Sequence, residues 1–361
     1  MDKNLGMLKK LTEADGTPAN EKEVRKIMKE YIKDYADEVY TDKLGSLIAK
    51  KVGNNDGPRI MVAGHMDEIG FMVTGIDDNG FLSFQPLGGW STGVMGAQKV
   101  TVTTSRGNKF MGIINTTPSF VLSPEQRNKQ ANMKDMYIDL GVNCKVEAEM
   151  LGIRPGDMVT PYFEFSTMAN PKYLVAKAWD NRVGCAIAID VMKNLKDENH
   201  PNEVYSVGTV QEEVGCRGGK TSSHVVKPDI GISIDVGMAA DTPGISKKDG
   251  VGDLGRGPQI NIYDGSMVGH SDLRNFVVNV AEELNIPYQY AYIPFGGTDA
   301  GPMHTTLEGA PCIYIGIPTR YIHSHAGIIH RDDYDNAVKL ITEVIKRLDN
   351  DTVKLIIEGE E

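Results

Sequence analysis

Four apolar runs of strand length stand out along the chain, and each is continuous rather than alternating. They cover residues 59–67, 204–213, 229–237 and 311–319. Apolar positions recur at helical spacing in the intervals 183–195, 271–284 and 335–348. Continuous apolarity indicates strands that are covered on both faces. We therefore expect an α/β fold with a mixed or largely parallel sheet flanked by helices.

A further amphipathic helix is predicted near the N-terminus. Its apolar residues are Val24, Ile27, Met28, Tyr31, Ile32 and Tyr35. Asn20 and Glu23 have the spacing of a capping box, so we expect the helix to begin at Asn20.

The segment 70–163 has a different pattern. Short alternating runs with β-branched residues, such as 99–104, are separated by turn signals at Asn79-Gly80 and Pro155-Gly156. The sequence therefore predicts a β-rich domain, at 70–163, inserted into an α/β domain formed by 1–69 and 164–361. Residues 117–135 are polar and contain two prolines, so an exposed loop is expected there.

Composition narrows the classes of partner. The 361 residues carry a net charge of −11, which disfavours nucleic acid or an anionic membrane and favours a peptide or small-molecule substrate. The N-terminus lacks the apolar core of a secretory signal and no segment reaches membrane-spanning length, so a cytoplasmic protein is expected. The four cysteines form no C-x-x-C pair, and we expect them to be reduced core residues.

Carboxylates and imidazoles follow the apolar runs. In open α/β sheets ligands gather outside the carboxyl ends of strands, so these residues are candidates for a common site. They are His65, Asp67, Asp180, Glu212, Glu213, Asp235 and His323.

Each candidate also has a structural interpretation. Asp180 would cap a helix, Asp235 would bond the turn at Gly237, His65 would be a hydrogen-bonded structural residue, and paired glutamates usually form a solvated edge. The co-occurrence of these residues favours a common cation-binding site over separate structural roles, because several charges at buried strand ends repel one another unless cations neutralise them.

Two histidines and three carboxylates without a thiolate suit zinc, cobalt or manganese. The Asp67 carboxylate is close enough in sequence to reach back to the His65 imidazole and fix its tautomer. Successive residues of a strand point in opposite directions, so of Glu212 and Glu213 one is expected to bind metal and the other to serve as a general base.

The motifs GHMDEIG, AWDNRVG, QEEVGCRGG, SIDVG, GGTDAG and TRYIHS, in this order along essentially the whole chain, closely resemble the tetrahedral (TET) aminopeptidases. These are the glutamyl, lysyl and deblocking aminopeptidases of metallopeptidase clan MH, family forty-two. The resemblance implies a catalytic α/β domain interrupted by a β-barrel-like, PDZ-resembling dimerisation domain. It also implies dimers that assemble into a tetrahedral dodecamer.

The same resemblance implies two divalent metal ions per subunit. Asp180 would bridge them, with His65 and Asp235 on one ion and Glu213 and His323 on the other. Glu212 would be the general base that activates the attacking water, and Asp67 would orient His65. The implied reaction is removal of N-terminal residues from peptides.

The glycine-rich loop 294–302 could line the substrate cleft with Gly296, Gly297, Thr298 and Asp299, although an ordinary turn also fits it. Arg320 either selects an acidic first residue or pairs with a neighbouring carboxylate. Glutamyl, leucyl and lysyl preferences all stay open. Two other functions compete with the aminopeptidase: a metal-independent endo-acting glucanase and a non-catalytic assembly protein with structural metals.

Overall fold

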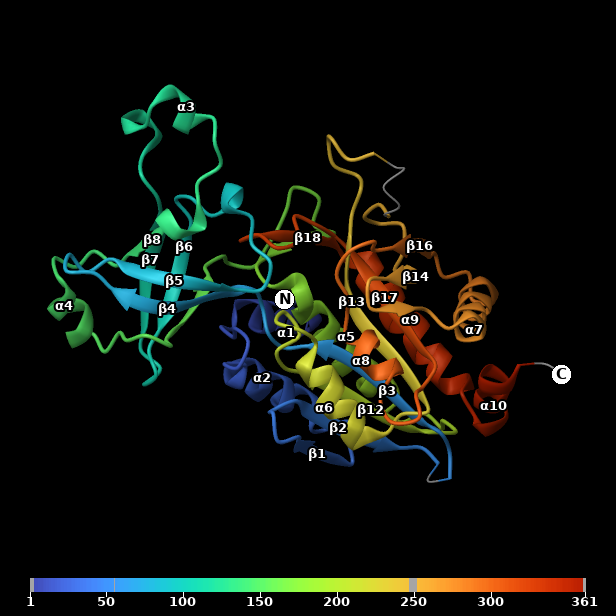
Figure 1. Ribbon diagram of the computed structural model, residues 1–361. Coiled ribbons are helices and arrows are strands. Elements are labelled where there is room, and N and C mark those ends of the chain that lie inside the picture. The colour runs from blue at the N-terminus through green and yellow to red at the C-terminus, as the bar shows by residue number, and fades with distance from the viewer. Residues whose placement is uncertain (1–2, 55, 247–251, 360–361) are drawn as a thin grey trace.

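The computed structural model describes residues 3–54, 56–246 and 252–359. It contains one large sheet with helices on both faces and a separate closed barrel, which projects to the left in Figure 1. The predicted fold class, an α/β mixed sheet flanked by helices with an inserted β-barrel-like domain, is confirmed.

Twelve strands form the large sheet. Nine follow one path, in the spatial order β1 (Glu38–Thr41), β2 (Leu47–Val52), β12 (Glu203–Thr209), β3 (Arg59–His65), β13 (Ile230–Met238), β17 (Cys312–Arg320), β18 (Gly327–His330), β11 (Tyr173–Ala176) and β10 (Ser166–Thr167). Beside β17 lies β14 (Gln259–Asp264), which also pairs with β15 (Met267–Val268) and β16 (Gln289–Tyr292). The four central strands β12, β3, β13 and β17 run parallel, so their carboxyl ends meet at one edge.

Strand β3 shows why the central runs are apolar without alternation. Ile60 and Val62 pack into the core on one face of the sheet, whereas Met61 and Ala63 pack into the core on the other. Because successive side chains point to opposite faces, a strand covered by helices on both sides needs apolar residues throughout.

The helices of the α/β part cover both faces of this sheet (Figure 1). They are α1 (Lys3–Glu13), α2 (Lys22–Ile32), α5 (Trp179–Asn194), α6 (Arg217–Val226), α7 (Ser271–Glu283), α8 (Ala300–His304), α9 (Arg331–Arg347) and α10 (Asn350–Glu358). One core includes residues of α5 and α9, and the other includes residues of α6 and α8. None of the described helices is both long and apolar enough to cross a bilayer.

A close backbone contact between β3 and α5 brings the beginning of α5 to the end of β3. A Cβ added to Gly64 would lie 2.6 Å from the backbone carbon of Gly184. Only glycine permits this approach, and it sets Asp180 beside His65.

The barrel is closed by six antiparallel strands around an apolar core that includes Phe71, Val100 and Ile138. In spatial order they are β4 (Gly70–Ile76), β5 (Leu82–Leu87), β8 (Tyr137–Asp139), β7 (Lys109–Asn115), β6 (Lys99–Thr103) and β9 (Met158–Pro161). Its short helices are η1 (Thr92–Val94), η2 (Ser119–Val121), α3 (Pro124–Arg127), η3 (Met133–Asp135) and α4 (Lys145–Met150). The segment 117–135 is largely exposed, as expected, and its α3 projects from the barrel (Figure 1).

The expected capping box at Asn20 and Glu23 is wrong. Helix α2 begins at Lys22, so Glu21 occupies the N-cap position, and the helix ends before Tyr35. The Glu21 carboxylate instead accepts hydrogen bonds from the backbone N–H groups of Ala19 (2.8 Å) and Gln211 (3.1 Å). A contact with a distant loop has therefore replaced the local cap.

The cysteine prediction is only partly confirmed. Cys185 and Cys312 are buried, but Cys144 and Cys216 are half-buried, and all four are free thiols.

Candidate metal centre and active-site cavity

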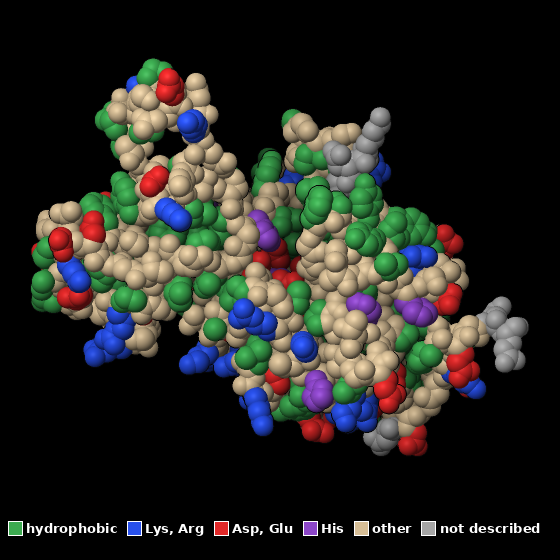
Figure 2. All heavy atoms as spheres, viewed as in Figure 1, with side chains coloured by type: hydrophobic (Ala, Val, Ile, Leu, Met, Phe, Trp, Pro, Cys, Tyr) green, Lys and Arg blue, Asp and Glu red, His purple; other side chains and the backbone are tan. Residues whose placement is uncertain are grey.

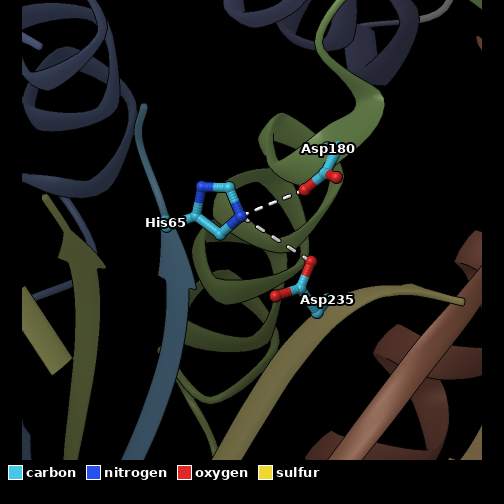
Figure 3. Close-up of side chains that lie close together, drawn as sticks. All are labelled: His65, Asp180 and Asp235. Carbon is cyan, nitrogen blue, oxygen red and sulfur yellow. Dashed lines mark hydrogen bonds and ion pairs between the residues drawn. The ribbon is translucent and has the colours of Figure 1, made fainter. Parts of the chain in front are cut away.

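His65, Asp180 and Asp235 point toward one another from the end of β3, the first turn of α5 and β13 (Figure 3). His65 Nε2 lies 3.0 Å from Asp180 Oδ1 and 3.8 Å from Asp235 Oδ1. The imidazole is 1% exposed and the Asp235 side chain 8%. Three residues far apart in the sequence thus form one buried group.

Asp180 also belongs to a second group, with Glu213 and His323. His323 Nε2 lies 3.3 Å from Asp180 Oδ2 and 3.6 Å from Glu213 Oε2. Within each group of three, one ligand atom from every residue lies within 4.8 Å of the others, which is close enough to hold a metal ion. Figure 2 shows a hollow between the barrel and the α/β part, with histidine and acidic side chains on its floor.

Asp180 is free to serve both groups because its neighbour caps the helix. The Asn181 side-chain oxygen accepts from Gly184 N at 3.0 Å, and its amide donates to the Ile234 carbonyl at 2.7 Å. The backbone at Asp180 and Asn181 is non-helical, and their peptide bond is cis. The alternative role of Asp180 as a helix cap therefore falls to Asn181, which the sequence analysis did not identify.

Asp67 makes two separate sets of contacts in the site, one through its backbone carbonyl and one through its carboxylate. Its carbonyl lies 2.9 Å from His65 Nδ1, whereas its carboxylate Oδ1 is 3.6 Å from that nitrogen. A hydrogen bond to a carbonyl requires a proton on Nδ1, which leaves the Nε2 lone pair facing Asp180 and Asp235. The Asp67 carboxylate instead accepts from the backbone N–H groups of Glu212 (3.0 Å) and Glu213 (3.1 Å).

The two glutamates do not lie on a strand, so the alternation argument used to separate them is wrong. Strand β12 ends at Thr209, and Gln211 has a positive φ of 56°, which turns the chain before Glu212. Glu213 belongs to the second group, whereas Glu212 belongs to neither. Glu212 Oε1 accepts from the Cys216 thiol at 3.1 Å, a contact that the sequence analysis missed.

Burial dominates the electrostatics of this cluster. It raises the pKa of Glu212 to about 8, and it raises the pKa values of Glu213 and Asp235 well above the ordinary carboxyl range. Asp180 is the exception: burial acts upward, but hydrogen bonds with His323 and His65 bring its pKa below the ordinary value.

Positive charge is scarce around these carboxylates. Within the described residues, their ion pairs are all with His65 or His323. Buried carboxylates without lysine or arginine partners are expected where cations bind.

The cluster opens into a cavity of about 730 Å³. Gly296, Gly297 and Thr298 of the glycine-rich loop line it. Asp299 does not: its side chain is buried and accepts a hydrogen bond from Thr209. Arg320 is also absent from the lining.

The inserted barrel contributes backbone to the same site. After β5, Gly88 and Gly89 approach the second group so closely that an added Cβ would lie 3.0 Å from Glu213 Oε2 and 2.9 Å from His323 Nδ1, respectively. A side chain at either position would displace a candidate ligand. Gly89 also lines the cavity, which the sequence analysis did not foresee.

The family model for M42 glutamyl aminopeptidases matches residues 45–340. The chain belongs to this family. The glutamyl aminopeptidase of Lactococcus lactis is 34% identical over 96% of this chain and 97% of its own length. The TET aminopeptidase of a marine sediment Thaumarchaeota archaeon superposes with a TM-score of 0.96 at 43% identity, covering 98% of this chain and 99% of its own. The TET1 peptidase of Pyrococcus horikoshii, described as assembling into a tetrahedron or a large octahedral shell, gives a TM-score of 0.86 at 32% identity over 96% and 100%.

Membership confirms the resemblance to the TET aminopeptidases and identifies the chain as a peptide hydrolase with aminopeptidase function. Peptidases of this family depend on metal, in agreement with the two groups of candidate ligands. The glucanase and the non-catalytic assembly protein are both disfavoured by this assignment.

Proposed function

We propose that this M42 peptidase removes N-terminal residues from peptides with two divalent cations per subunit and with Glu212 as the general base. One observation carries the proposal: two ligand groups share Asp180, and Glu212 lies beside them without belonging to either. His65 and Asp235 would hold one cation, and Glu213 and His323 the other.

The residues present fit such cations. Glu213 Oε1 is buried and has no hydrogen-bond partner among the described residues, so it is available as a ligand. The His65 tautomer directs a lone pair at the first group. Imidazole and carboxylate ligands suit zinc, cobalt and manganese.

Bound divalent cations would supply Lewis-acid polarisation of the scissile carbonyl and lower the pKa of water. The chain supplies the proton transfers. Glu212 Oε1 is engaged by the Cys216 thiol, whereas Oε2 lies 3.7 Å from His65 Nε2 at the edge of the first group. Oε2 is therefore the oxygen that takes a proton from the attacking water and returns it to the leaving amine.

An exopeptidase must recognise a free α-amino group. With cations bound, the polar end of the cavity would select a free α-amino group as a ligand of a cation, which supports the choice of a peptide N-terminus over an internal bond. The Asp67 side chain is a positioning residue, because its carboxylate binds the backbone N–H groups of Glu212 and Glu213.

Assembly into dimers and then a tetrahedral dodecamer, with the domain 70–163 as the dimerisation element, is part of the proposal. It is supported by the assemblies described for the P. horikoshii TET1 peptidase. Light scattering of the purified protein tests it, and a monomer at micromolar concentration would contradict it. The cytoplasmic location stays a prediction.

Glu212→Gln tests the assigned general base. Gln keeps the size of the side chain but cannot accept the proton, so kcat should fall by on the order of 10²-fold or more while metal content is unchanged. Glu203→Gln, the same substitution at the opposite end of β12, is the control and should keep kcat. Near-normal turnover of metal-replete Glu212→Gln would refute the role.

A further inference from the structure

The cavity beyond the metal centre is built almost entirely from apolar side chains. Val236 and Met238 come from the end of β13, and Tyr292, Ile293 and Phe295 from the end of β16 and the loop after it. Ile322 comes from the loop after β17. The charged residues that line the cavity are the candidate metal ligands and Glu212. One end is therefore polar, and the remaining wall is apolar.

A carboxylate side chain would find no cation on this wall. No lysine or arginine lines the cavity within the described residues. The arginine nearest in sequence to His323, Arg320, donates to both oxygens of Asp241 at 2.8 and 2.6 Å and lies over the Tyr173 ring at 5.4 Å. Its guanidinium is committed to a bidentate pair. Lys247 and Lys248 lie outside the described residues.

A lysine side chain at the first position of the substrate would also find no partner of opposite charge on this wall. The carboxylates that line the cavity are Asp180, Glu212, Glu213 and Asp235, and all of them belong to the polar end. In the proposed reaction they hold metal or transfer protons. An ammonium group placed against the apolar wall would lose hydration without gaining a partner.

We propose that this enzyme selects peptides whose first residue is uncharged and apolar, such as leucine, methionine or phenylalanine, over peptides that begin with an acidic or basic residue. The inference rests on the proposed function and adds its substrate class. It departs from the glutamyl activity that names the L. lactis relative.

Phe295 and Met238 define the outer part of the binding wall. Phe295 is 86% exposed beside Gly296 and Gly297, on a loop at the cavity mouth, so an apolar substrate side chain would cover it. Met238 is 44% exposed at the last position of β13. Substitution of such a rim residue leaves the core packing intact.

The test is a panel of aminoacyl-p-nitroanilides with one leaving group, assayed on the metal-supplemented enzyme. We expect kcat/KM for leucyl to exceed that for alanyl by on the order of 10- to 100-fold, because three more carbons are buried. Leucyl should exceed glutamyl and lysyl by on the order of 10²-fold, because a charge must be desolvated. Free leucine should also inhibit more tightly than free glutamate, a readout that does not depend on turnover.

Charge substitution at Met238 assigns the preference to this wall. Met238→Lys should raise the glutamyl-to-leucyl ratio by roughly fivefold, and Met238→Glu should raise the lysyl-to-leucyl ratio similarly, as half-exposed ion pairs do. Met238→Leu should keep the wild-type order.

The results of the panel distinguish a failure of the proposed apolar preference from a failure of the proposed aminopeptidase function. Failure to cleave any member of the panel would refute the proposed function. Cleavage with a preference for glutamyl or lysyl would leave the function standing and overturn the inference. Unchanged ratios in both charged variants would also overturn it. A glutamyl preference lost in Arg217→Gln would place the first side chain in the neighbouring groove that Arg217 lines.

Discussion

Asp67→Asn tests the claim that one buried carboxylate positions both glutamates. The Asp67 side chain is fully buried, and its two oxygens accept the backbone N–H groups of Glu212 and Glu213 at 3.0 and 3.1 Å. Asparagine keeps the shape but has one acceptor oxygen, and its amide N–H would face a backbone N–H. One of the two hydrogen bonds must be lost.

The size of the effect follows from that count. A hydrogen bond to a charged group contributes about 1.5–3 kcal/mol, and about 1.4 kcal/mol is a factor of ten in an equilibrium constant. Losing either bond loosens the loop that carries Glu213, so metal binding at the group of Glu213 and His323 should weaken by up to roughly 10–100-fold. The His65 ring keeps its bond to the Asp67 carbonyl, so the group of His65 and Asp235 should be less affected.

The assay is a chelator-competition titration that resolves two metal affinities, together with kcat/KM. Asp157→Asn is the matched control, because Asp157 is also buried and its carboxylate also accepts two backbone N–H groups, from Ser105 (3.1 Å) and Arg154 (2.9 Å), in the barrel. Both variants should lose similar stability to urea, but only Asp67→Asn should lose metal. Equal metal affinities in the two variants would refute the reasoning.

Three further changes test the ligand set, the buried ions and the pH response. Asp180→Ala removes the shared ligand and should leave less than half of the metal by elemental analysis; full content would refute sharing. Lys177→Met removes the ammonium that lies 2.6 Å from buried Glu68. Arg182 stays 3.0 Å from the same carboxylate, so the free energy of unfolding in urea should fall by about 1.5–3 kcal/mol, and a loss below about 1 kcal/mol would contradict it. Burial, and then the charge of Asp67, raises the pKa of Glu21 to about 7 from its ordinary 4.5, so the folded state binds this proton more tightly and stability should fall as pH rises from about 4.5 to 7, by at most about 3 kcal/mol. Glu21→Gln should remove that fall in chelator-treated protein, and identical pH slopes would contradict it.

The sequence predicted the candidate ligands because each lies at, or within a few residues of, the end of an element whose pattern is visible locally. His65 ends a continuous apolar run and Asp235 lies within another, so parallel strands bring them to one edge of the sheet. The strand boundaries were less accurate. Extending the run 204–213 through Glu213 hid the turn at Gln211, whose positive φ rather than strand alternation separates the two glutamates.

Residues that act through tertiary contacts left no local signal. Gly89 reaches His323 from a barrel loop, and nothing in its neighbourhood in the sequence indicates that approach. The spacing of Asn20 and Glu23 fits a capping box locally. In the structure Glu21 occupies the N-cap position instead, and its carboxylate accepts a hydrogen bond from the backbone N–H of the distant Gln211. The sequence shows that Arg320 lies near His323 but does not reveal its ion-pair partner, because that partner, Asp241, is 79 residues away.

Hydrogen bonds with residues that belong to neither ligand group hold the candidate ligands in place. Asn181 caps the helix, which leaves both oxygens of Asp180 for the two ligand groups while the positive end of α5 favours their charge. The carbonyl of Asp67 fixes His65, and its carboxylate fixes the loop of Glu212. The candidate ligands are thus held in place by residues outside the two ligand groups, so substitutions at Asn181 or Asp67 should weaken metal binding.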